Sequence, residues 1–311
     1  MDKSNKSSLE LRSLSDLFAE HFPSKVQKIS INAGFTCPNR DGNKGFGGCT
    51  YCNNQTFSPQ YTGDQKSINQ QLEEGIRFFS HKYPTMKYIA YFQSYTNTYG
   101  DISDLMDKYQ TALNHPEVIG LIIATRPDCM PNALLDELQK LNEKYFLLIE
   151  YGVETTNNHT LKYINRGHSY EDAVDAITRT HERGILCGAH LILGLPGESK
   201  EMILAHANRI SQLPLTTLKL HQLQLIRGTK MAHQYEKEPE LFRLPSVDDY
   251  IDLCIEFMER LSPDIIIERF VSQSPKELLI APDWGLKNYE FTAKLNKRIR
   301  ERNTFQGRLF S

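Results

Sequence analysis

Three cysteines near the N-terminus have a spacing that could support metal chemistry. Cys37, Cys49 and Cys52 follow the pattern C-x11-C-x2-C within sixteen residues. Thiolates are soft ligands that bind iron–sulfur clusters and soft metal ions. A cube of four irons held by three cysteines leaves one iron with an open position, and open positions are where metal centres do chemistry. The spacing therefore predicts a catalytic [4Fe–4S] cluster.

A structural zinc site is the alternative for the same three cysteines. Such sites are usually closed by four ligands. No fourth Cys or His lies between Phe22 and Ser80, and His21 and His81, which flank that stretch, lack ligand spacing. The other cysteines are expected to be small apolar core residues; they are Cys129, Cys187 and Cys254.

Three more polar residues interrupt apolar stretches further along the chain. His190, Lys219 and His221 lie in segments otherwise rich in Leu and Ile. Residues two apart on a strand share a face, so Lys219 and His221 point the same way. Burying them without partners is costly. Each could be a hydrogen-bonded core residue, but as a group we expect them to line a substrate cavity and to be catalytic.

Strands alternate with helices from about residue 26 to residue 225. The three clustered cysteines and the three polar residues all lie within this alternating region. Alternation of this kind favours a parallel α/β sheet, and six units fit a partial (β/α)6 TIM-like barrel or a doubly wound sheet. Barrel enzymes place their chemistry at the C-terminal strand ends. The predicted strands are 26–31, 88–93, 118–124, 146–151, 186–193 and 217–223; the predicted helices are 68–81, 102–114, 131–142, 170–183 and 200–213.

We divide the chain into an N-terminal extension (1–25), the barrel (26–230) and a C-terminal extension (231–311). The extension is expected to complete the barrel side with a helix over 247–261 and a strand over 265–270. Its tail, 284–311, has seven basic and two acidic residues, a net charge of +5, among five aromatic residues. Basic and aromatic residues together suit looped RNA. A solvated C-terminal helix that packs a few aromatics into the barrel explains the same pattern equally well.

Composition excludes some classes of protein. The net charge of −2 gives no global basic field for nucleic acid, although a local patch is compatible with it. No window of eighteen apolar residues is present, so we expect no membrane partner. The first ten residues lack the apolar core of a signal peptide. We expect a cytoplasmic protein.

Several stretches resemble the radical S-adenosylmethionine (SAM) superfamily. Cys49-Thr50-Tyr51-Cys52 matches the C-x-aromatic-C half of its signature, while the first gap of eleven residues departs from the usual three and resembles Elongator-type proteins. More closely, the chain resembles the bacterial YhcC/YtqA-type radical SAM family. The stretches that carry this resemblance are 33–42, 47–52, 91–96, 125–129, 164–168 and 190–198. The resemblance implies a [4Fe–4S] cluster, SAM cleaved to a 5′-deoxyadenosyl radical, and an electron donor such as flavodoxin or ferredoxin.

The resemblance also implies which residues bind SAM. Tyr51 would lie against the adenine, with Gly194 and Leu195 as part of the adenine-binding turn. Glu154 would hold the ribose, because a carboxylate accepts both hydroxyl protons.

The methionine half would be held by Gln93, Ser94 and Arg166. Gln93 and Ser94 occupy the place of the amine-binding residues, and the planar guanidinium of Arg166 fits the SAM carboxylate. Taken singly, Gln93 could simply end a strand and Arg166 could lie in a solvated turn.

The resemblance further implies a tRNA partner, because Elongator-type enzymes modify the wobble uridine. The 311 residues leave no room for an acetyltransferase domain, so we expect modification or trimming of an existing C5 substituent. Two alternatives stay open. One is a radical SAM enzyme that acts on a small metabolite, and the other is a non-catalytic, metal-stabilised RNA-binding protein.

Overall fold

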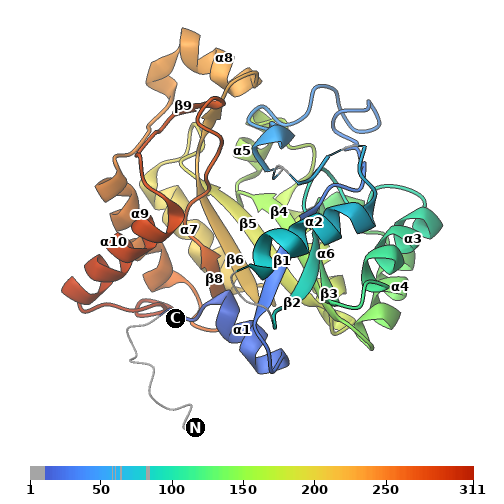
Figure 1. Cartoon of the computed structure of the whole chain (residues 1–311). Helices are drawn as coiled ribbons and strands as arrows, with labels where there is room; N and C mark the ends of the chain where they lie inside the picture. The colour runs from blue at the N-terminus through green and yellow to red at the C-terminus, as the bar shows by residue number, and fades with distance from the viewer. Residues whose placement is uncertain (1–10, 58, 60, 64, 82–84) are drawn as a thin grey trace.

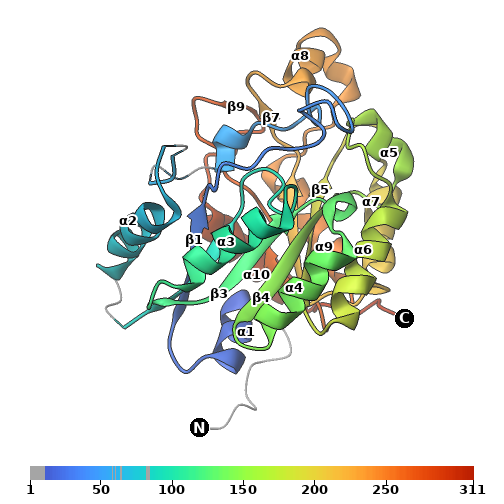
Figure 2. The ribbon, with the colours of Figure 1, turned by 90° about the vertical axis from the view of Figure 1, so that its right-hand side faces the viewer.

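Seven strands form one curled parallel sheet that is covered by helices on its outer face (Figures 1 and 2). The computed structural model describes residues 11–311 except 58, 60, 64 and 82–84. Every neighbouring pair of strands is parallel, which confirms the predicted partial barrel. In sheet order the strands are β1 (Val26–Ile31), β2 (Lys87–Phe92), β3 (Val118–Thr125), β4 (Phe146–Glu154), β5 (Leu186–Leu193), β6 (Thr217–Gln222) and β8 (Ile266–Arg269).

The connecting helices begin at capping residues that the sequence supplies. The side chains of Ser67, Ser169 and Ser199 each accept a backbone N–H of the first turn of their helix, which satisfies donors that a helix leaves unpaired. Gly184 has φ +69° and ends α6, a conformation that glycine adopts readily. These helices are α2 (Ile68–Ser80), α3 (Ile102–Leu113), α4 (Asn132–Asn142), α6 (Tyr170–Glu182), α7 (Lys200–Ser211) and α9 (Val247–Arg260).

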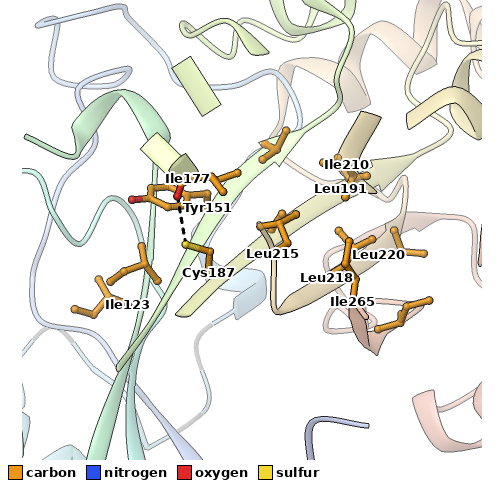
Figure 3. Packing of buried hydrophobic residues seen from close by; sticks show 14 of the residues in the cluster. Ile123, Tyr151, Ile177, Cys187, Leu191, Ile210, Leu215, Leu218, Leu220 and Ile265 are labelled. Carbon is orange, nitrogen blue, oxygen red and sulfur yellow. Dashed lines mark hydrogen bonds between the residues drawn. The ribbon is translucent and has the colours of Figure 1, made fainter. Parts of the chain in front are cut away.

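The core lies between the sheet and these helices. Cys187 on β5 packs beside Tyr151 and Ile177, and its thiol donates to the Ile177 carbonyl oxygen at 3.6 Å (Figure 3). Burial raises the pKa of Cys187 to about 12. Cys254 on α9 is fully buried. Both are apolar core residues, as the sequence predicts.

The C-terminal region supplies the seventh strand, since β8 pairs with β6 through Thr217 and Ile266. The structure also contains shorter elements that the sequence analysis does not anticipate. They are α1 (Leu14–His21), α5 (Asn158–Tyr163), β7 (Leu225–Ile226), α8 (Lys230–Lys237), β9 (Leu279–Ala281) and the 3-10 turns η1 (Asn54–Phe57), η2 (Pro127–Cys129) and η3 (Pro239–Leu241). The C-terminal helix that is one of the two explanations of the tail is α10 (Asn288–Glu301).

The basic and aromatic tail packs along the side of the barrel. Trp284 stacks on Phe291 of α10 with ring centroids 6.0 Å apart, and both rings lie against Tyr250 of α9. The Gln306 side chain donates to the carbonyl oxygens of Ser262 and Ile265, just before β8 begins. The end of the chain therefore lies at the amino ends of the strands, opposite α8 and β9 (Figure 1).

No helix in the described part of the chain has the length and apolar character needed to cross a bilayer.

Candidate active site

The three cysteines of the C-x11-C-x2-C pattern line one cavity at the C-terminal ends of the strands. They lie in the long loop after β1, which we call the cysteine loop (33–66). Backbone contacts join this loop to the segment after α5: Thr50 donates its N–H to the Ile164 carbonyl at 2.9 Å, and the Asn165 side chain donates to the Gly48 carbonyl at 2.8 Å. The loop is thereby fixed against the mouth of the barrel.

Nitrogen donors surround the thiols. Asn39 Nδ2 and Arg166 Nη1 each lie 3.6 Å from Cys49 Sγ, and Asn54 Nδ2 lies 3.9 Å from Cys52 Sγ. Burial and the neighbouring Cys49 raise the pKa of Cys52 to about 11, against the opposing effect of Arg40. N–H groups of this kind stabilise thiolates and the sulfurs of iron–sulfur clusters. The donor set fits a [4Fe–4S] cluster with three cysteine ligands.

Within the described residues, no three His, Cys, Asp or Glu side chains converge on a single-ion site.

Beside Cys49, a buried arginine faces the same cavity. Arg166 Nη2 donates to the Gly152 carbonyl at 2.7 Å and lies 3.4 Å from Glu154 Oε1, whereas its buried Nε has no partner among the residues that the structure describes. Burial opposes the charge of Arg166, but Tyr51, Cys49 and Glu154 outweigh burial and raise its pKa well above the ordinary value. A permanent cation with a free N–H suits the carboxylate of SAM.

The backbone around Arg166 and Glu154 leaves no room for a side chain at Gly152. A Cβ on Gly152 would lie 2.5 Å from Arg166 Nη2 and 2.6 Å from Glu154 Oε1. Glu154 itself has φ +68°, and Asn165, just before Arg166, has φ +52°. Non-glycine residues rarely adopt positive φ, and they cluster at functional sites when they do. The local fold is thus shaped around the Arg166–Glu154 pair.

Of the other residues predicted to bind SAM, some line the cysteine cavity and some do not. Tyr51 and Gln93 line the cavity with the cysteines, and Ser30 Oγ donates to Gln93 Oε1 at 3.2 Å. Ser94 is buried and is not part of the cavity wall. Leu195 packs in the same apolar cluster as Tyr51, although it lines a separate cavity beside α9 together with Gly194.

The predicted catalytic residues belong to a buried ionic network in the barrel lumen. Lys219 Nζ lies 2.6 Å from both carboxylate oxygens of Glu150, and Tyr91 donates to Glu150 Oε2 at 2.7 Å. His190 Nε2 lies 3.1 Å from the same oxygen. His190 lines the cysteine cavity, and Lys219 lines an adjoining cavity that shares Gln93 with it.

The network continues to the two edges of the sheet. Lys28 of β1 pairs with Glu268 of β8, and Lys219 Nζ lies 3.3 Å from Glu268 Oε1. Arg269 Nη2 donates to His221 Nε2 at 2.9 Å, and the described part of the chain offers no partner to the buried Nε of Arg269. An ionic bridge therefore spans the open side of the half-barrel.

Burial sets the protonation of this network. It lowers the pKa of Lys219 to about 8, although Glu150 acts in the opposite direction. Burial also lowers the pKa of His190, helped by Lys219, and lowers that of His221 well below its ordinary value, helped by Arg269. The two histidines are therefore neutral, so that His190 donates its Nε2–H to Glu150 and His221 accepts from Arg269 at Nε2.

Sequence reasoning missed the partners that hold these side chains. Glu150, like His190, is a polar residue in a strand of mostly apolar residues. The argument that identified His190 could therefore have identified Glu150. Arg126 gave no comparable signal: it donates to the Arg166 carbonyl at 2.8 Å and pairs with Asp128. Cys129, beside them, is buried, and burial and Asp128 raise its pKa to about 12.

Comparison with known proteins agrees with this geometry. The profile of the Radical SAM superfamily matches residues 34–210, and that of the Radical_SAM C-terminal domain matches residues 215–301. YtqA of Bacillus subtilis is 36% identical over 94% of this chain and 90% of its own length. YhcC of Escherichia coli is 32% identical over 94% of each.

More distant relatives share part of the chain or only the fold. A tRNA uridine(34) acetyltransferase of Dehalococcoides mccartyi is 28% identical over 55% of this chain and 36% of its own length. The solved structure of the Methanocaldococcus infernus Elp3 lacking its N-terminus superposes with a TM-score of 0.67 at 18% identity, covering 91% of this chain and 64% of that one.

Proposed function

Because the chain belongs to the radical SAM superfamily, and within it to the YhcC/YtqA-type family, we propose that it alters the C5 side chain of a tRNA wobble uridine. When bound, the cluster and SAM supply a radical that takes a hydrogen atom from the substrate, at the expense of one electron from a flavodoxin or ferredoxin. The residues of this chain then have to hold SAM, position the substrate and exclude water.

The observation that carries the proposal is a single cavity that joins two sets of residues. Its lining includes the three cysteines with Arg166 and Glu154, and it also includes His190 and His221. Arg166 is suited to the SAM carboxylate and Glu154 to its ribose hydroxyls. SAM and a substrate group can therefore lie side by side in one enclosed space, as a hydrogen transfer between them requires.

The lumen network suits the substrate rather than SAM. Neutral His190 and His221 face the cavity, while Lys219 and Glu150 fix their surroundings. Polar groups held this firmly can orient a substituent and its amine or hydroxyl groups. The partial similarity to a tRNA uridine(34) acetyltransferase supports a uridine as the substrate. The substituent would already be present when the tRNA binds.

The test is tRNA modification by the reconstituted protein. Bulk tRNA is incubated anaerobically with the protein, SAM and a reductant, and its wobble nucleosides are analysed by mass spectrometry. We expect the mass of one wobble uridine derivative to change, with 5′-deoxyadenosine formed in step, and no change with Cys49→Ala. Unchanged nucleosides together with normal SAM cleavage would contradict the tRNA proposal and favour a small metabolite.

A further inference from the structure

Two exposed aromatic rings lie beside the cysteine cavity. Phe46 of the cysteine loop is 77% exposed, and Tyr95, after β2, is 37% exposed. Phe46 lies against Gly42, where a Cβ would come within 2.7 Å of the ring, and the Tyr95 backbone N–H donates to Asn54 Oδ1 at 3.3 Å. Tyr95 also lines the cavity. Aromatic rings left in water next to a site are typical of binding surfaces.

Three cations surround the same loop. Lys230, at the start of α8, lies close to Gly47, since a Cβ on Gly47 would be 2.8 Å from Lys230 Nζ. The Arg227 carbonyl accepts from Asn53 Nδ2 at 3.3 Å, and Arg40 Nη2 donates to the Cys52 carbonyl at 2.9 Å. We call Arg40, Phe46, Tyr95, Arg227 and Lys230 the cysteine-loop rim.

Arg227 and Lys230 give the rim a positive charge, and Arg40 also faces the Cys52 thiol. Among the described residues, neither Arg40, Arg227 nor Lys230 takes part in an ion pair. Asp41 on the same loop is exposed and contributes one negative charge. Lys44 is different, because it pairs with Asp128 at 2.6 Å.

The C-terminal tail, the other basic and aromatic segment, has several of its cations in ion pairs with α9 and lies elsewhere on the molecule. Arg298 pairs with Asp248 and Asp252 of α9, and Arg308 pairs with Glu259. The end of the tail also lies away from α8 and the cysteine loop (Figure 2). Three of the seven tail cations, Arg298, Arg302 and Arg308, thus pair with acids of α9.

Resting on the proposed function, we propose that the cysteine-loop rim, and not the tail, docks the single-stranded loop of the RNA. Its cations would contact phosphates, and Phe46 and Tyr95 would stack on bases. Phosphate contacts position a strand and aromatic stacking holds unpaired bases. Because Arg40 and Tyr95 also line the cavity, a base turned out of a strand docked there enters beside the cysteines.

The first test compares two double variants that each replace two cations with two carboxylates. Arg227→Glu/Lys230→Glu changes the rim, and Lys294→Glu/Arg300→Glu changes exposed α10 residues that have no ion pair among the described residues. tRNA binding is measured by fluorescence anisotropy at several salt concentrations. The rim variant should bind at least about tenfold more weakly, and the slope of log affinity against log salt should fall by about 1.4 for two lost phosphates. Equal losses in both variants, or a loss only in the α10 variant, would overturn the proposal.

A second pair tests stacking. Phe46→Ala should weaken tRNA binding by about tenfold with little change in the salt slope. Tyr289→Ala, which removes another exposed ring on α10, should have no effect. A Phe46→Ala variant that binds like the parent protein would remove stacking from the proposal and count against the rim.

These outcomes separate this proposal from the proposed function. If the parent protein binds no tRNA, both are wrong. If the parent binds tRNA and the rim variants bind as tightly, only the rim proposal is wrong. If the rim variants bind tRNA normally but lose reduction by flavodoxin and keep reduction by dithionite, the rim is the electron-donor surface and the RNA proposal is overturned. Unchanged 5′-deoxyadenosine formation with dithionite and no tRNA shows that each variant is folded and holds its cofactors.

Discussion

Lys219 Nζ lies 2.6 Å from both carboxylate oxygens of Glu150, inside the lumen of the half-barrel, and both side chains are almost completely buried. The two residues come from strands β6 and β4, which are separated in the sheet by β5. Tyr91 from β2 completes the group. A buried ion pair is stable only when both charges and their hydrogen bonds are present.

Removing one partner of this pair should therefore destabilise the fold. Lys219→Met leaves the Glu150 carboxylate buried without its cation and should lower the free energy of unfolding by about 3–5 kcal/mol. The double variant Lys219→Met/Glu150→Gln should recover most of that loss, because no unpaired charge remains. Urea unfolding of the three proteins measures both effects. A single variant as stable as the parent protein would show that the pair does not act as described.

The pH dependence of turnover should report Lys219. Burial lowers its pKa to about 8, so the ammonium loses its proton as the pH rises through that value. Substrate-dependent product formation should fall in the same range, whereas SAM cleavage without substrate should not. Lys219→Arg keeps its charge at all accessible pH values and should move the fall to higher pH. The same profile in Lys219→Arg and the parent protein would assign the fall to another group.

The lowered pKa of Lys219 also determines how its contribution to the free energy of unfolding changes with pH. The folded pKa of Lys219 is about 8, below the value of about 10.4 for an unfolded lysine. Between these values the unfolded chain binds more protons, so this residue alone makes unfolding less favourable as the pH rises from 8 to 10.4. Comparing the pH dependence of unfolding in Lys219→Met and the parent protein isolates that contribution.

Arg166 should determine the affinity for SAM. Arg166→Lys keeps the charge and loses the planar fork that fits a carboxylate, so the Kd for SAM should rise about 10- to 100-fold. Anaerobic equilibrium dialysis measures the Kd, and the iron–sulfur absorbance shows that the cluster is retained. Arg183→Lys, at an arginine that pairs with Asp136 on the surface, is the matched control. An unchanged Kd in Arg166→Lys would exclude it from the SAM site.

Gly152 should be needed for the same site because it leaves room for the Arg166 guanidinium. A Cβ there lies 2.5 Å from Arg166 Nη2, so Gly152→Ala must displace the guanidinium and weaken SAM binding. Gly100→Ala is the control, since its nearest neighbour, Leu105 Cδ2, is 3.6 Å from a Cβ. The SAM affinity of both variants is measured beside their thermal stability. A Gly152→Ala protein with the parent's SAM affinity would contradict the crowding argument.

Much of the fold could be predicted from local patterns, and the site only in part. Alternating strands and helices indicated the parallel half-barrel, and the spacing of Cys37, Cys49 and Cys52 placed them in one loop. The role of Arg126 could not be predicted, because it depends on the approach of two loops forty residues apart. The tail was harder to interpret for a similar reason. Its net charge of +5 is visible in the sequence, but the α9 acids that pair with Arg298 lie about fifty residues earlier in the chain.

The central claim is that Cys37, Cys49 and Cys52 hold a cluster that cleaves SAM. The most direct test is anaerobic cluster reconstitution followed by SAM and dithionite, with 5′-deoxyadenosine as the readout. Cys37→Ala, Cys49→Ala and Cys52→Ala are compared with Cys129→Ala, whose buried thiol does not line the cavity. We expect iron–sulfur absorbance and 5′-deoxyadenosine in the parent protein and in Cys129→Ala, and no 5′-deoxyadenosine in the other three variants. Stoichiometric zinc, no iron–sulfur absorbance and intact SAM in the parent protein would contradict the account.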